Sequence, residues 1–320
     1  MAIVANTFTR YSAIGIREDL SNVIYNIAPE ETPFISNIGR ESVKNTYFEW
    51  QTDTLAAASA ANAALEGDDV TSFTAVTPTA RVGNYTQIST KNVVISGTLD
   101  ALDKAGRRSE VTYQLAKMGS ELKRDMEAAL LANQASVAGN TTTARRTAGL
   151  PAWLTSNTSA GVGGANPTVG STPTAARTDG TQRAFTEALL KTVVASVWDN
   201  GGTPKMLMVG SFNKQAASAF TGVATKFRDV PAGQQAQIIG AADVYVSDFG
   251  TINIVPNLFI RARDALIVDP EYASLAVLRP IQQEELAKTG DAEKRLMLVE
   301  YGLKVKNQAA HGIVADLTVS

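Results

Sequence analysis

The stretch RRSEVTYQLAKMGSELKRDMEAALLANQASVA, residues 107–138, predicts one long amphipathic helix. Its apolar residues recur at alternating steps of three and four, which places them on one stripe of a helix with about 3.6 residues per turn. The stripe consists of Val111, Leu115, Met118, Leu122, Met126 and Ala129. Ser109 suits the N-cap and Gly139 suits the stop. Such a helix would be about 45 Å long, so we expect a strut, with an ordinary core helix on a sheet as the alternative.

The composition describes a globular chain that carries no strong overall charge. With 320 residues, of which 44% are hydrophobic, the chain can bury the core of one large or two moderate domains. A formal net charge of -2 gives no basic field to hold DNA or an anionic membrane. No run of about 18 apolar residues is present, so we expect no membrane span and no membrane partner.

The residue inventory argues against most catalytic and metal sites. The chain has no cysteine and one histidine, His311, which we interpret as structural. The Asp-Phe-Gly at 248–250 and the GVGG at 161–164 lack the surrounding motifs of a kinase or a phosphate loop. Adjacent carboxylates, as in Glu284 and Glu285, diverge on a helix or strand and indicate solvated charge. We therefore predict no catalytic residue, no cofactor and no metal.

Residues 1–46 have little periodicity and predict an extended arm. Pro29 and Pro33 each disfavour helix at the residue before them, which bends the segment APEETPFISNIGR. The arm carries Phe34, Ile35 and Ile38, and these side chains must be buried in the same subunit or a neighbouring one.

Residues 47–95 predict a protruding hairpin. TYFEWQTD, with Phe48 and Trp50 on one side, reads as a strand, and RVGNYTQISTKNVVIS at 81–96 reads as its partner. The residues between them are small and polar, too many for a simple connection. A helix over residues 55–65 is a second possibility, because alanine favours it.

The rest of the chain predicts a second, mixed α/β unit. Residues 155–180 are rich in Gly, Ser, Thr, Asn and Pro, and predict a long surface loop or linker. Helices are expected over residues 185–197 and 214–220, and strands over 206–209, 243–249, 251–257 and 264–269. RLMLVEYGLKVKN at 295–307 alternates cleanly, so we expect it to pair with the strands near 47–52 and 85–95.

The order of these parts resembles the major capsid protein of tailed phages, the Hong Kong 97 type of fold. Six blocks carry the resemblance: PEETPFISNIGR, FEWQTDTL, DVYVSDFGTINIVPN, DPEYASLAVLRP, ELAKTGDAEKR and VEYGLKVKNQAAHGIVADL. They span both ends of the chain in the same order as in the family. The resemblance implies an α+β chain with an N-terminal arm (1–46), an extended β-hairpin loop (47–95), a peripheral domain with a spine helix (96–145 and 285–320) and an axial domain (146–284).

The resemblance also implies a structural function in the virion. Copies would form pentamers and hexamers of an icosahedral head around non-specifically packaged double-stranded DNA, assembled in the host cytoplasm. The implied partners are other copies of the chain, a portal and a separate scaffolding protein, since no fused scaffolding segment is evident. A cellular nanocompartment shell of the same fold is one alternative, and an α/β enzyme is the alternative from a different class.

Five residues are candidates for assembly contacts. Phe34, Ile35 and Trp50 would anchor the arm and the base of the loop, with intrachain core as the alternative for each. Arg107 and Arg108 lie at the start of the strut, and Arg145 and Arg146 beyond its far end. These doublets could meet phosphate or a neighbour's carboxylates, or they could be solvated.

Overall fold

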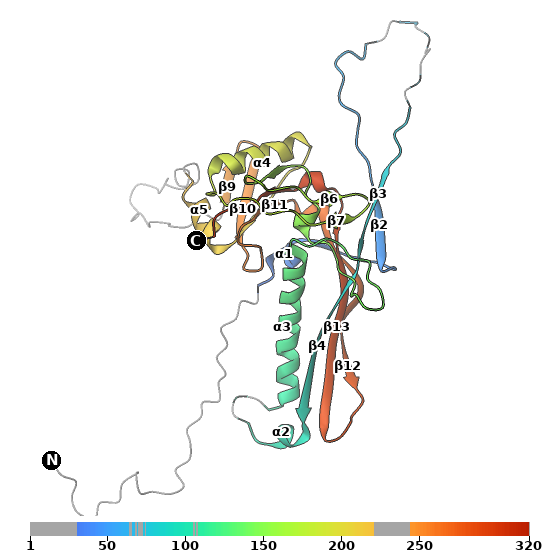
Figure 1. Cartoon of the computed structure of the whole chain (residues 1–320), viewed down its shortest axis with the longest axis vertical. Helices are drawn as coiled ribbons and strands as arrows, with labels where there is room; N and C mark the ends of the chain where they lie inside the picture. Colours follow the sequence, from blue (N-terminus) through green and yellow to red (C-terminus); the bar gives the residue numbers. More distant parts are fainter. Residues whose placement is uncertain are drawn as a thin grey trace, which may run out of the picture.

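The computed structural model describes residues 31–63, 66–67, 69, 73, 75–104, 106, 108–220 and 244–319. Within these residues the chain has the predicted α+β class. A long helix stands beside a narrow sheet, a broader sheet lies at one end of that helix, and a two-stranded ribbon projects from the same end (Figure 1).

The described helices and 3-10 turns are α1 (Pro33–Asn37), α2 (Gly97–Ala101), α3 (Glu110–Leu131), η1 (Leu150–Ala152), α4 (Glu187–Asp199), α5 (Ser211–Ser218), η2 (Pro270–Tyr272) and η3 (Gln308–Ala310). The narrow sheet has the order β1 (Gly39–Ser42), β12 (Ala273–Leu286), β13 (Ala292–Val305), β4 (Gln87–Ser96). The broad sheet has the order β5 (Thr158–Ser159), β14 (Gly312–Val314), β11 (Ala265–Val268), β8 (Met206–Val209), β10 (Gly250–Pro256), β9 (Val244–Ser247). Two ribbons pair β2 (Tyr47–Thr52) with β3 (Ala80–Tyr85) and β6 (Thr168–Val169) with β7 (Pro173–Ala175).

The strut is α3, and it is shorter than predicted. Ser109 caps it as expected, its side chain accepting the backbone N–H of Thr112. The helix ends at Leu131, because Ala132 turns extended and the Asn133 side chain exchanges two hydrogen bonds with the backbone of Arg177. Twenty-two residues make it about 33 Å long. Gly139, the predicted stop, lies instead in a later turn with a φ of 74°.

The predicted stripe of α3 is the side that packs on the narrow sheet. Met118, Leu122 and Met126 share one buried cluster with residues of β13, namely Met297, Val299, Tyr301 and Leu303. β13 pairs with β4, as predicted for 85–95. The expected pairing of β13 with 47–52 is wrong, because β2 pairs with β3 and the other neighbour of β13 is β12.

The hairpin prediction needs two corrections. Residues 81–96 are two strands in different sheets, separated at Thr86, whose N–H donates to the carbonyl of Thr46. The helix considered for 55–65 is absent from its described part, residues 55–63, which has no regular structure beyond a turn.

The arm also differs from its prediction where it is described. Pro33 is the first residue of α1, a position where its missing N–H costs nothing, so 33–37 form a short helix instead of an extended bend. Residues 1–30 of the predicted arm lie outside the described residues.

The mixed second unit is confirmed, with helices α4 and α5 and strands β8 to β11 near their predicted places. Residues 155–180, expected as a long surface loop or linker, contain the short strands β5, β6 and β7 and bury Arg177. Sheet membership moves two edges of the expected division into domains. Residues 273–284 belong to the narrow sheet through β12, and β14, expected in the peripheral part, belongs to the broad sheet.

Candidate assembly surfaces

The β2–β3 ribbon carries the protruding loop, which we define as residues 53–79. The two strands pair from Tyr47 with Tyr85 to Thr52 with Ala80, and the loop continues outward from them (Figure 1). Among the described residues, three apolar side chains of this loop are almost fully exposed: Leu55 is 99% exposed, Phe73 88% and Val76 91%. Soluble chains that expose apolar groups on a projecting segment usually bury them against a partner.

The protruding loop is also acidic. It contains Asp53, Glu66, Asp68 and Asp69 and no lysine or arginine. Loops from different copies would therefore repel one another and would avoid DNA, which is polyanionic.

Aromatic side chains fix the base of the ribbon to the body. The Phe48 ring lies so close to Gly302 of β13 that a Cβ on this glycine would be 2.6 Å from Phe48 Cε1. Phe48 stacks with Trp50 at 5.9 Å between ring centroids, and Trp50 contacts Trp153 at 5.5 Å. Trp50, one of the predicted contact residues, thus lies half-buried at the base of the loop, as predicted, and its partners are in its own chain.

Asn84 joins the ribbon to two other segments. Its amide nitrogen donates to Thr147 Oγ1 at 3.0 Å and to the carbonyl of Leu303 at 2.7 Å. Its side-chain oxygen accepts the N–H of Ala148 at 3.0 Å. Asn84 is fully buried, so each of these bonds forms away from competing water.

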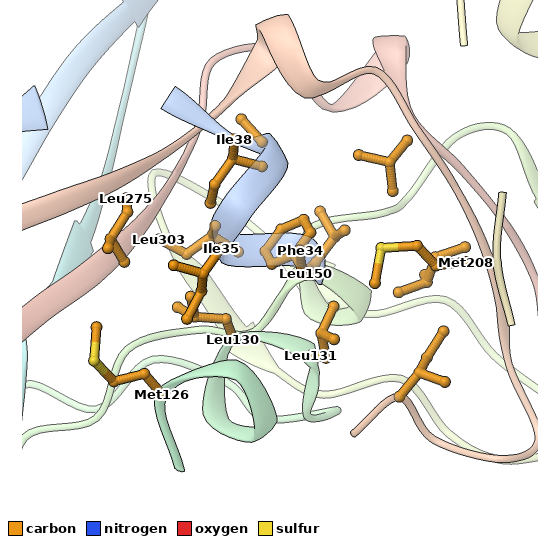
Figure 2. Close-up of a cluster of buried hydrophobic side chains, with 14 of the residues drawn as sticks. Phe34, Ile35, Ile38, Met126, Leu130, Leu131, Leu150, Met208, Leu275 and Leu303 are labelled. Atoms are coloured by element: carbon orange, nitrogen blue, oxygen red, sulfur yellow. The ribbon is translucent and has the colours of Figure 1, made fainter. Parts of the chain in front are cut away.

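The arm is held on α3 by a buried carboxylate. Phe34 has no exposed surface and Ile35 is 6% exposed, and Figure 2 shows both among side chains of α3, β12 and β13. Glu127 of α3 accepts the backbone N–H groups of Phe34 at 2.7 Å and Ile35 at 2.9 Å. These two predicted contact residues occupy the intrachain core, so their side chains leave little surface for a neighbouring subunit.

Glu127 itself is fully buried and links three segments. Asn257, which follows β10, donates to it at 2.7 Å, so the carboxylate connects the arm, the spine and the broad sheet. Burial raises the pKa of Glu127, and the three hydrogen bonds oppose this rise.

Glu300 of β13 forms a second buried junction. It accepts Thr86 Oγ1 at 2.8 Å, Arg145 Nη2 at 2.5 Å and Arg279 Nε at 2.8 Å. Arg145, which could have met a neighbour's carboxylate, therefore pairs with a carboxylate of its own chain. Arg146 pairs through its backbone with Val137.

Of the basic doublet at the start of the spine, the structure describes one residue. Arg107 lies outside the described residues, and Arg108 is exposed beside an open hollow lined by Ser109, Thr112 and Tyr113. The Asp100 carboxylate already accepts the N–H of Glu110 at this helix end, at 3.0 Å.

None of the described helices packs on the face of the narrow sheet opposite α3, which we call the open face. Alternation along β4 turns Val93 towards the core and leaves Ile88 (46% exposed) and Val94 (60%) on the opposite face. Val94 pairs with Lys294, which pairs with Leu286, and Leu286 is 38% exposed in the same row. The described residues thus leave three apolar side chains of this face exposed, although the ribbon and the Arg145 segment cover its other end at Glu300 and Gly302.

Other kinds of site are not found in the described part of the chain. No group of three or more His, Asp or Glu side chains there could hold a metal ion. None of the described helices is long and apolar enough to span a membrane. Sequence reasoning missed Glu127, Asn84, Glu300 and Gly302, and the one local signal was a glutamate in the apolar run DMEAALL.

Comparisons with known proteins agree with one another. The family model of the SU10 major capsid protein matches residues 3–318. The major capsid protein of Escherichia phage Phieco32 is 28% identical over 345 residues, which cover 96% of each chain.

Solved structures share the fold at low identity. A chain of Gordonia phage Cozz has a TM-score of 0.63 and 12% identity, covering 99% of this chain and 98% of its own. A chain of Mycobacterium phage Adephagia has a TM-score of 0.60 and 13% identity over 95% and 96%. The capsid of a native GTA particle gives 0.60 and 14% over 95% and 96%. The expected Hong Kong 97-like fold is thus confirmed, and the chain belongs to the SU10 major capsid protein family, the structural proteins of phage head shells.

Proposed function

We propose that this head protein forms pentamers and hexamers of an icosahedral shell around double-stranded DNA, with the protruding loop of each copy lying over a neighbouring copy. The observation that carries the proposal is the near-complete exposure of Leu55, Phe73 and Val76. Burying three such side chains in every contact would stabilise the assembled state, and repetition around the shell turns modest contacts into a stable particle.

The open face of the narrow sheet is our candidate landing surface for that loop. It offers Ile88, Val94 and Leu286, which the chain itself leaves exposed. The loop leaves the body at the opposite end from the β12–β13 turn, so it points away from the end of the open face that carries Val94 and Leu286 (Figure 1). The loop of a second copy can cover these exposed side chains.

The acidic character of the loop supports a position away from the packaged DNA. Four carboxylates without a basic residue would be repelled by a phosphate backbone. A portal, a separate scaffolding protein and assembly in the host cytoplasm belong to the same proposal. Regular empty shells from this chain expressed alone would argue against the scaffolding protein.

The test replaces Leu55, Phe73 and Val76 together by serine. We expect subunits with unchanged thermal unfolding that no longer form closed shells by electron microscopy and sedimentation. Val162→Ser is the matched control, because Val162 is 85% exposed on a different loop, and it should assemble normally. Closed shells of the triple variant at normal yield would refute the role of the loop.

A further inference from the structure

The glycine-rich segment that sequence reasoning assigned to a linker contacts the base of the β2–β3 ribbon. Its β6–β7 hairpin lies next to β2 and β3 (Figure 1), and the N–H of Gly83 in β3 donates to the carbonyl of Ser171 in the hairpin turn at 2.7 Å. The hairpin thus binds the edge of β3 that faces away from β2.

The hairpin is itself anchored to the segment that follows α3. The Ser136 N–H and hydroxyl both donate to the carbonyl of Pro173, at 3.1 Å and 2.7 Å. The same hydroxyl lies 2.8 Å from Thr172 Oγ1. Pro173 is buried, so the hairpin is fixed to the body at the residue next to its turn.

Apolar contacts reinforce this arrangement. Val169 of the hairpin packs on the same buried cluster as Trp50 and Val82, which face each other across the ribbon. A two-stranded ribbon is marginally stable by itself and can twist and bend about its base. Phe48 against Gly302 fixes one place on the ribbon, and the hairpin adds a separate point of support on β3.

We propose that the β6–β7 hairpin is a brace that sets the direction in which the protruding loop leaves the subunit, and so decides where the loop meets a neighbouring copy. Its effect on shells rests on the proposed function of the loop. Its effect on loop direction does not, because that direction is a property of the single subunit.

Distance measurements between spin labels test the brace directly. The chain contains no cysteine, so Leu55→Cys in the loop and Ala188→Cys on α4 would give two unique labels. Both positions are exposed. In unassembled subunits that are otherwise unchanged, we expect a single narrow distance distribution.

Two variants weaken the brace and one leaves it intact. Ser136→Ala removes the hydroxyl bonds, and replacing residues 170–172 by one glycine removes the carbonyl that Gly83 uses. Ser171→Ala is the control, because Ser171 takes part through its backbone. In the two brace variants we expect a distance distribution that is at least twice as wide as that of the parent or has a different mean distance. The Ser171→Ala control should give the same distribution as the parent. Unchanged distributions in both brace variants, with folding intact by circular dichroism, would overturn the proposal.

Shell assembly of the same variants separates this inference from the proposed function. Misshapen or fewer closed shells, together with widened distributions, would support both. Normal shells despite widened distributions would keep the brace and refute the assembly role of the loop. Normal distributions with defective shells would refute the brace alone.

Discussion

Glu127 is a buried residue of α3 that connects this helix to two other segments. It accepts two backbone N–H groups of α1 and the Asn257 amide, at distances of 2.7 to 2.9 Å. Glu127→Gln places an NH₂ group where one of these donors points, so a buried donor loses its acceptor. We expect a loss of about 1–3 kcal/mol in the free energy of unfolding, measured by urea titration.

The matched control for that substitution is Glu121→Gln on the same helix. Glu121 is partly exposed, and its nearest cations lie at 3.8 Å and 3.9 Å. Exposed pairs of this kind contribute roughly 0–1 kcal/mol, so the control should unfold close to the parent. Equal losses in the two variants would contradict the role of Glu127.

His311 predicts a dependence of stability on pH. It is fully buried, its Nδ1 accepts the N–H of Asp269, and burial lowers its pKa to about 4. The unfolded chain therefore binds this proton more tightly than the folded chain. The neutral ring contributes about 3 kcal/mol to the free energy of unfolding above pH 6.5, and this contribution is lost as the pH falls towards 4. His311→Asn should flatten this part of the curve. The single histidine makes the ring easy to follow by NMR, and a titration near pH 6.5 in the folded state would contradict the prediction.

Asp264 predicts the opposite dependence. It is 1% exposed, and burial raises its pKa to about 6 although Arg261 lies 3.0 Å away. The folded chain therefore binds this proton more tightly, and stability from this group falls as the pH rises from about 4 to 6, by about 3 kcal/mol. Asp264→Asn removes the group, so its unfolding free energy should drop more steeply on acidification than that of the parent. Urea midpoints between pH 4.5 and 7.5 measure this, and a shallower drop would refute it.

At the scale of elements, the ribbon can contact β13 closely because position 302 is a glycine. A Cβ at Gly302 would lie 2.6 Å and 2.8 Å from Phe48 ring atoms and 3.1 Å from the carbonyl of Tyr85. Gly302→Ala must displace the Phe48 ring, and overpacking of this kind costs about 1–3 kcal/mol. Gly170→Ala is the control, because a Cβ there would meet nothing within 4 Å.

Calorimetry can measure the effect of Gly302→Ala on stability, and nuclear magnetic resonance can measure its effect on the aromatic rings. We expect the melting temperature of Gly302→Ala to fall while that of Gly170→Ala stays unchanged. The aromatic signals of Phe48 and Trp50 should shift in the first variant and remain in place in the second. A stable Gly302→Ala protein with unshifted rings would show that Phe48 does not need this glycine.

For the whole molecule, the charge balance suits a container for DNA. A net charge of -2 gives the chain no general attraction for the double-stranded DNA that we propose it encloses. We expect particles from infected cells to protect double-stranded DNA against added nuclease and to contain no enclosed enzyme. Agarose gels and mass spectrometry of purified particles measure both. Packaged protein in place of DNA would favour the nanocompartment alternative.

Patterns that depend on local geometry were predictable from the sequence alone. The start and apolar stripe of α3, the fully apolar strand β8 and the alternation in β13 follow from helical and strand periodicity, which a few neighbouring residues determine. The protruding hairpin and the position of Trp50 at its base were predictable for the same reason. The order of these parts along the chain was enough to identify the fold family.

Only the tertiary structure decided where elements end and which polar groups are buried. α3 stops at Leu131 because Asn133 bonds to the backbone of Arg177, forty-four residues away in the chain. Glu300 lies on the predicted polar side of β13, yet it is buried because Arg145 and Arg279 neutralise it. β12 was missed because its second half is exposed and polar, so its period gives no signal. Contacts between distant residues leave no local pattern, and the arm anchor, the base of the ribbon and the brace are all built from such contacts.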